Sequence, residues 1–312
     1  MLESYSRGGL HYQQCYYGTS RLAFRGPEVP LEGDYVAVLG GNATFGKFVS
    51  QPYPELLDKV SGIRTVNLGC MHAGMTAFVD DPSLIDICSH ARATIVQITG
   101  AHCLDNVFYS LHPRRNDRFI DATPRLRALY PDVDFTEFHF VRHMLSALYS
   151  TSPEAFVDVV DALKHEWVMR TRDLIRQIDG PVVLFWMADR GPDMPNAPIA
   201  EQLRYDDPLF VDREMIDAVR RDATDVVMAI ASDTAQNEGL AGKIFSDFER
   251  PAAMRMPGPL WHAEAATALF DVVTDLVPER PKPRARKRAE GRAEDRPGGR
   301  PIRASRSARG QR

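Results

Sequence analysis

The sequence predicts an α/β fold in which a mostly parallel sheet of five strands carries helices on both faces. Five short runs of β-branched and other apolar residues alternate along the chain with segments of helical periodicity. Apolar residues are nearly continuous within each run, which is typical of strands buried on both faces. Strands that alternate with helices form parallel sheets, because each helix returns the chain to the start of the next strand.

The strands are expected at residues 35–39, 65–68, 94–99, 181–187 and 225–230. Apolar residues at helical spacing predict helices near residues 56–60, 84–88 and 215–219 and over residues 263–277. Because crossovers between parallel strands are right-handed, few topologies remain, and a flavodoxin-like strand order is the most economical. The prediction is therefore a three-layer, flavodoxin-like domain.

A long interval between the third and fourth strands predicts a helical insertion at about residues 124–179. One helix is expected at residues 135–149. A second begins after Ser152, which can cap it, with Pro153 at the first helical position. Its apolar spacing continues to Asp179 and Gly180, a typical helix end. The two helices form a hairpin that could pack on the sheet, cover the site or support a dimer.

The composition is that of a soluble globular protein. The chain has 312 residues, of which 44% are hydrophobic and 26% charged. Its start lacks an apolar signal core, and no run reaches the ~18 apolar residues of a membrane helix. Four cysteines without a C-x-x-C pair suit free thiols in a reducing compartment. We therefore expect a cytoplasmic protein with no membrane partner and no cofactor, whose oligomeric state the sequence does not determine.

The last 34 residues differ from the rest of the chain. Residues 279–312 hold 13 Lys and Arg against 4 Asp and Glu, so the remainder carries 25 against 38, a balance of −13. With no aromatic residue, this segment cannot bury enough surface to order itself. We expect an N-terminal arm at residues 1–30, one domain at 31–278 and a disordered basic tail at 279–312. The tail either contacts nucleic acid or another polyanion weakly or simply screens an acidic body.

Small and polar residues follow the predicted strands. In an open α/β sheet, ligands bind outside the carboxyl ends of the strands, near the point where strand order reverses. The segments at these ends are residues 40–44, 67–72, 100–106 and 189–191, and residues 257–262 precede the last helix. Glycines, histidines and amides are therefore expected to meet at one edge of the sheet and to form a ligand site.

These segments resemble the motifs of the SGNH or GDSL-type hydrolases, which have a flavodoxin-like three-layer fold. Residues 40–46 read G-G-N-A-T-F-G and are similar to the family's first block, G-D-S-x-T-x-G. Residues 67–69, 100–103 and 259–262 resemble the second, third and last blocks. The resemblance implies an SGNH-hydrolase-like core over most of residues 34–277.

The resemblance also shows where this chain departs from the family pattern. The nucleophilic serine corresponds to Asn42, the acid that orients the histidine to Pro259, and the oxyanion asparagine to His102. A Ser-His-Asp mechanism needs all its members, and loss of the nucleophile typically costs ~10⁶ in rate. Standard esterase chemistry is therefore not expected.

The whole chain also resembles a bacterial family known only as domain of unknown function 6473. The resemblance is carried by residues 17–21, which read Y-G-T-S-R, and residues 112–118, which read H-P-R-R-N-D-R. It implies no activity.

Three arginines cluster on a predicted loop after the third strand. Arg114, Arg115 and Arg118 carry guanidinium forks that recognise carboxylate, phosphate or sulfate. They indicate an anionic ligand. The alternative is pairing with nearby acids, such as Asp105, Asp117 or Asp121.

Three hypotheses for the function remain. In the first, the chain is an enzyme that uses His262 as general acid or base and the amides of Gly41, Asn42 and Gly69 as anion donors, with group transfer favoured over hydrolysis. In the second, Cys70, Cys103 and the neighbouring histidines form a metal or thiol site, against which stands an apolar role for the cysteines. In the third, the chain is a binding or scaffold protein that kept the fold, because the Asn42 amide suits recognition.

We expect recognition, and in the first hypothesis group transfer, of a small polar ligand that is anionic or glycosidic. No metal ligand is assigned. The predicted catalytic residues are His262 and Asn42. The predicted ligand-binding residues are Gly41, Thr44, Gly69, His72, His102, Asn106, Arg114 and Arg115.

Overall fold

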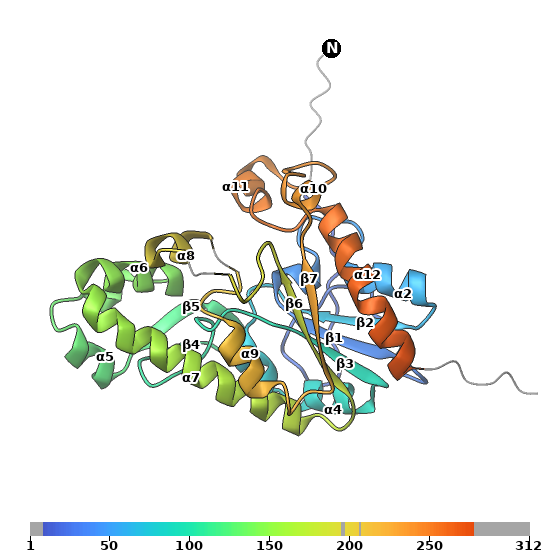
Figure 1. The fold of residues 1–312 in the computed structure, drawn as a ribbon, viewed down its shortest axis with the longest axis horizontal. Helices are drawn as coiled ribbons and strands as arrows, with labels where there is room; N and C mark the ends of the chain where they lie inside the picture. The colour runs from blue at the N-terminus through green and yellow to red at the C-terminus, as the bar shows by residue number, and fades with distance from the viewer. Residues whose placement is uncertain (1–8, 195–196, 206, 278–312) are drawn as a thin grey trace, which may run out of the picture. The chain divides into compact units, whose positions relative to one another are not determined.

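The structure is a computed structural model that describes residues 9–194, 197–205 and 207–277 (Figure 1). Five strands form one sheet in the order β2-β1-β3-β6-β7. They are β1 (Val36–Gly40), β2 (Thr65–Gly69), β3 (Ala93–Gln97), β6 (Val182–Ala188) and β7 (Asp225–Ile230). Every pairing in this sheet is parallel, which confirms the predicted flavodoxin-like α/β fold.

Helices cover both faces of the sheet, and successive residues of each strand pack alternately against one helical layer and the other. Val36 and Val38 face α2 (Tyr53–Ser61) and α12 (Pro259–Leu276), which lie together on one side (Figure 1). Ala37 and Leu39 belong to the opposite core. That core includes residues of α3 (Met75–Val79), α4 (Pro82–His90), α7 (Pro153–Gln177) and α9 (Arg213–Val219). The strands are buried on both faces, which explains their continuous apolar sequences.

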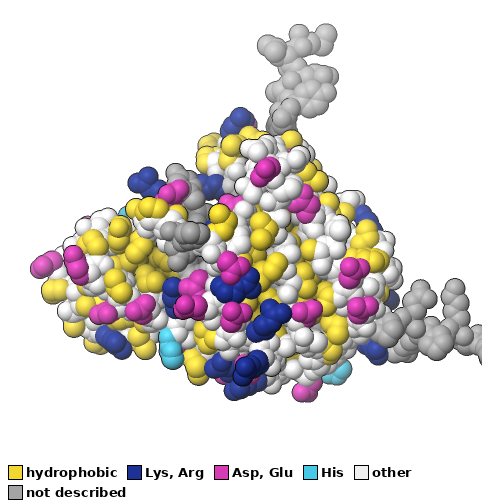
Figure 2. Space-filling model, viewed as in Figure 1, with side chains coloured by type: hydrophobic (Ala, Val, Ile, Leu, Met, Phe, Trp, Pro, Cys, Tyr) yellow, Lys and Arg dark blue, Asp and Glu magenta, His cyan; other side chains and the backbone are white. Residues whose placement is uncertain are grey.

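Along the chain, shorter elements connect these strands and helices. They are α1 (Asn42–Phe45), α5 (Pro124–Leu129), α6 (Val141–Thr151), α8 (Ile199–Tyr205), α10 (Asp233–Gln236), α11 (Arg250–Ala253) and the 3₁₀ turns Phe135–Glu137 and Asp247–Glu249. Acidic and basic side chains are interspersed on the face shown in Figure 2. None of the described helices is long and apolar enough to cross a membrane. The predicted tail lies outside the described residues.

The segment between β3 and β6 differs from its prediction in two places. The expected arginine loop is a hairpin of β4 (Tyr109–His112) and β5 (Arg115–Ala122). The expected helix at 135–149 is a 3₁₀ turn followed by α6, because residues 138–140 are extended beside β5. The Phe119 N–H donates to the His139 carbonyl (3.1 Å), and Arg118 forms a bridge with Phe140. The long helix α7 begins as predicted, with the Ser152 hydroxyl accepting from the Ala155 N–H.

The N-terminal arm packs into the domain. Cys15, Tyr17, Leu22 and Phe24 are buried, and Phe24 forms an antiparallel bridge with Cys70 just after β2. The described part of the arm therefore lies beside the carboxyl ends of the strands, where a site is expected.

Candidate functional site

Two separate hollows lie at or beside the strand ends. The first, which we call the strand-end pocket, has a volume of about 300 Å³. It is lined by residues that follow β1, by the last residue of β3, by residues at the end of β6, by Asp207, by the chain between β7 and α12, and by the first turn of α12. Its polar lining residues are Asn42, Gln97, Asp189, Asp207, Gln236, Lys243, Arg255 and Trp261. This is the place at which an open α/β sheet binds ligands.

The glycines around α1 permit very close packing of backbone and side chains. A Cβ atom at Gly40 would lie 2.0 Å from Thr44 Oγ1, and one at Gly69 would lie 2.2 Å from the Phe45 nitrogen. Any side chain at these two positions would displace α1, so glycine is required.

Gln97, at the end of β3, holds α1 in place. Its Oε1 accepts hydrogen bonds from the Gly41 N–H (3.2 Å), the Thr44 N–H (3.2 Å) and the Thr44 hydroxyl (2.6 Å). The Tyr53 hydroxyl completes the network at 2.8 Å from Thr44 Oγ1. Gly41 and Thr44 therefore use their donors on Gln97, and they hold α1 in place without lining the pocket themselves.

Asn42 is the predicted site residue that reaches the strand-end pocket. Its Oδ1 accepts a hydrogen bond from the His72 N–H at 3.0 Å. This bond fixes the orientation of the amide. Nδ2 has no hydrogen-bond partner among the described residues, so the pocket retains a donor there.

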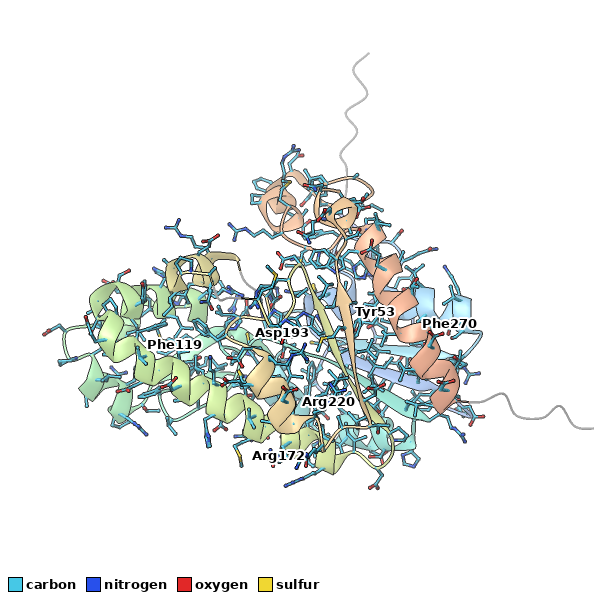
Figure 3. All side chains as sticks on the ribbon, in the orientation of Figure 1. Tyr53, Phe119, Arg172, Asp193, Arg220 and Phe270 are labelled. Carbon is cyan, nitrogen blue, oxygen red and sulfur yellow. The ribbon has the colours of Figure 1, made fainter. Side chains whose placement is uncertain are left out.

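His262 lies in the first turn of α12 with its side chain buried, and it is not among the residues that line the pocket. Its Nδ1 accepts a hydrogen bond from the Tyr53 N–H (3.1 Å), and its ring stacks on Tyr53, whose place is shown in Figure 3. Burial lowers the pKa of His262 to about 3, and the charges of Arg25 and Lys243 act in the same direction. The imidazole is thus a neutral packed group whose proton sits on Nε2.

Gly69 and Asn106, two further predicted ligand residues, are engaged internally. The Gly69 N–H donates to Asn67 Oδ1 (2.9 Å). Asn106 donates to the Leu104 carbonyl (2.8 Å), and its Oδ1 accepts from the Phe108 N–H (2.9 Å). These groups shape the loops after β2 and β3 rather than face either hollow.

His102 and Cys103 contact each other, with Nε2 and Sγ 3.3 Å apart. Burial holds the pKa of His102 well below its usual value and raises the pKa of Cys103 to about 12. The thiol is therefore protonated at neutral pH and is a poor nucleophile. Among the described residues, no three His, Cys, Asp or Glu side chains lie where they could hold a metal ion. The structure does not bring the predicted Cys/His set together.

The second hollow, which we call the basic cleft, has a volume of about 410 Å³. The N-terminal arm, the loop after β2 and the β4–β5 hairpin line it. It contains the predicted residues His72, Arg114 and Arg115, together with Arg21 and His112. The two hollows share no lining residue. The bond between the His72 N–H and Asn42 joins their walls.

Arg25 ties the N-terminal arm to the chain that leaves α1. Its buried guanidinium donates to the carbonyls of Phe45, Gly46, Val49 and Ser50 at 3.0–3.4 Å. Four carbonyls converge on one charged group, so this arginine fixes the backbone that follows the site.

A family model described as "Domain of unknown function (DUF6473)" matches residues 1–277. The chain belongs to this family. No curated protein is significantly similar to this DUF6473 chain.

Three solved structures match part of the structure of the DUF6473 chain. They are a protein described as a GDSL-like lipase from Bacteroides ovatus (14% identity, TM-score 0.35), a family two carbohydrate esterase from Clostridium thermocellum in complex with cellohexaose (11%, 0.38) and a lipase from a goat rumen metagenome (10%, 0.37). The overlaps cover 81%, 81% and 76% of this chain. The chain spans 56%, 66% and 96% of those proteins, and the activities named for them belong to those proteins.

Asn42→Ser is expected not to create an esterase. The new hydroxyl would lie in the strand-end pocket, whereas His262 is buried, has Nδ1 occupied by the Tyr53 N–H and is too weak a base. Hydrolysis of p-nitrophenyl acetate by the variant should stay at the wild-type level. A gain of roughly 100-fold that His262→Gln then removes would contradict this account of His262.

Proposed function

We propose that this protein recognises a small, neutral ligand rich in hydroxyl or carbonyl oxygens, such as a glycoside, in the strand-end pocket and without a serine nucleophile. The charges that line the pocket support a neutral ligand. Two acidic side chains, Asp189 and Asp207, stand against two basic ones, Lys243 and Arg255. Their formal sum is zero, so the pocket offers no net attraction to an anion.

The hydrogen-bond groups of the pocket support a ligand with acceptor oxygens. The Lys243 ammonium donates to the carbonyls of Ala253 and Met256, and the Gln97 oxygen is used by α1. The Trp261 indole nitrogen, in contrast, is buried and has no partner among the described residues.

This unpartnered indole N–H is the observation that carries the proposal. A buried donor without an acceptor costs about 1–3 kcal/mol, and a ligand oxygen would remove that cost. The indole ring that carries this N–H can also cover the apolar face of a sugar. Asn42 Nδ2 supplies the second donor.

Recognition is favoured over group transfer by the position of His262. The histidine that would act as the base is buried outside the pocket lining and is held by Tyr53. A binding role requires only the groups that line the pocket.

The proposal is tested by tryptophan fluorescence during titration with methyl glycosides and short oligosaccharides. Trp167 and Trp186 are fully buried and donate to the carbonyls of Thr99 and Arg190, so a ligand in the pocket should change chiefly the emission of Trp261. Trp261→Phe keeps an aromatic ring and removes the N–H. It should abolish the fluorescence change and weaken binding about tenfold, as measured by calorimetry.

Asn42→Asp is the matched variant for the second donor. It keeps an oxygen for the His72 N–H and replaces Nδ2 by an acceptor, so binding should weaken while the loop after β2 stays in place. A fluorescence response that persists in Trp261→Phe would place the ligand elsewhere. The absence of any response across the whole set of glycosides would overturn the proposal.

A further inference from the structure

We propose that the basic cleft is a second binding site, which takes a tetrahedral oxyanion, phosphate or sulfate, carried by a small molecule. This inference goes beyond the proposed function, because it concerns a different hollow with different lining residues.

The charge of the cleft is the first observation. Its lining contains Arg21, Arg114, Arg115, His72 and His112, and it contains no Asp or Glu. Residues 1–278 carry 25 Lys and Arg against 38 Asp and Glu. Three arginines around one hollow in such an acidic body repel one another unless an anion enters, so the cleft has the electrostatic character of an anion site.

Two of these arginines are available to a ligand. The guanidinium groups of Arg21 and Arg114 make no ion pair within 4.0 Å and no hydrogen bond with any described residue. Acids lie in the adjoining hollow, which Arg21 and Arg114 also line, but each has another partner. Asp80 pairs with Arg170 (3.9 Å), Asp81 accepts from the Ser20 hydroxyl and Asp105 accepts from the Leu111 N–H.

Arg115 and His72 are held in position from behind the cleft, and burial lowers the pKa of His72 below its usual value, so the permanent charge comes from the arginines. Asp117 lies outside the lining, with its Oδ2 3.3 Å from His72 Nδ1 and its Oδ1 3.7 Å from Arg115 Nε. His72 adopts the left-handed backbone conformation (φ 62°), and its N–H donates to Asn42. A bulky residue in this conformation is often found at ligand sites, where the surrounding structure enforces it.

The chemistry of the lining selects a tetrahedral anion. Five cationic or imidazole side chains come from three segments of the chain, which exceeds what the two oxygens of a carboxylate can accept. A phosphate or sulfate group offers its oxygens in several directions at once.

The size and surroundings of the cleft select a small molecule over nucleic acid. A volume of about 410 Å³ is typical of a small-molecule pocket. Asp80, Asp81 and Asp105 in the adjoining hollow would repel the next phosphates of a polynucleotide.

The test is calorimetry of the full chain with sodium phosphate, sodium sulfate and sodium acetate at constant ionic strength. Arg21→Gln/Arg114→Gln should weaken the binding of phosphate or sulfate about tenfold or more. Because both arginines lack partners and repel each other, the variant should melt no lower than the wild type in chloride. The matched control is Arg220→Gln/Arg221→Gln, which removes the same charge from exposed arginines beside α9 that line neither hollow (Figure 3).

The three anions also separate the sources of the ligand. Binding of phosphate alone points to a phosphate ester, and binding of sulfate alone to a sulfate ester. Trp261→Phe should bind both anions as the wild type does, so failure of the glycoside proposal leaves this result unchanged. Four results would overturn the inference: neither anion binds, acetate binds as tightly, both double variants lose affinity equally, or a single-stranded oligonucleotide binds more tightly than phosphate.

Discussion

Arg25→Met is expected to lower the free energy of unfolding by about 3–5 kcal/mol, because it removes a buried charge that satisfies several buried groups. The guanidinium of Arg25 is buried and donates to four backbone carbonyls, and its Nε lies 3.7 Å from a Glu55 oxygen. Methionine fills most of the space but donates no hydrogen bond. Urea unfolding followed by circular dichroism measures the loss.

Arg64→Met is the matched control. Arg64 also donates to two backbone carbonyls, those of Pro30 and Glu32, but it is exposed, so water can replace it. Its replacement should cost less than about 1 kcal/mol. Equal losses in the two variants would show that Arg25 does not hold the chain after α1.

His262 is expected to make the protein unstable in acid. Below its usual pKa of about 6.5 the unfolded chain binds a proton there, whereas the folded protein does so only near pH 3, because burial lowers the pKa of His262. Protonation therefore stabilises the unfolded state relative to the folded state as the pH falls. The expected loss is about 1.4 kcal/mol per pH unit once the unfolded histidine is protonated.

The readout is the slope of the unfolding free energy against pH between about pH 5.5 and 4. His262→Gln should reduce this slope by about 1.4 kcal/mol per unit, whatever its effect on stability at neutral pH. The control for the loss of a histidine is His90→Gln, which alters a side chain that is 71% exposed. An unchanged slope in His262→Gln would mean that the buried histidine is protonated in the folded state.

The sheet could be predicted from the sequence because its strands are buried on both faces. Continuous apolar residues and intervening helices then determine the strand order with few alternatives. The structure of the segment after Phe135 could not be predicted from the sequence. Residues 138–140 are held beside β5 by contacts that helical periodicity does not reveal. The hairpin that carries Arg115 was missed for the same reason.

The candidate site was predicted in part. The strand-end rule placed Asn42 at the pocket, and the arginine cluster indicated the basic cleft. The rule could not reveal that His262 is occupied by Tyr53, which lies 209 residues away in the sequence. Gln97 had a usable signal, since it is a polar residue at the end of an apolar run. Arg21 reaches the basic cleft only through tertiary packing. Trp261 lies in the segment 257–262 that was expected at the site, but an apolar ring gave no reason to select it.

The central claim is that the strand-end pocket holds a neutral, oxygen-rich ligand on Trp261 and Asn42. The most direct measurement is a crystal structure of the protein grown with a methyl glycoside that changes its fluorescence. The account predicts the sugar in this pocket, with oxygens within about 3.2 Å of Trp261 Nε1 and Asn42 Nδ2. A sugar bound elsewhere, or one in the pocket that contacts neither nitrogen, would contradict it.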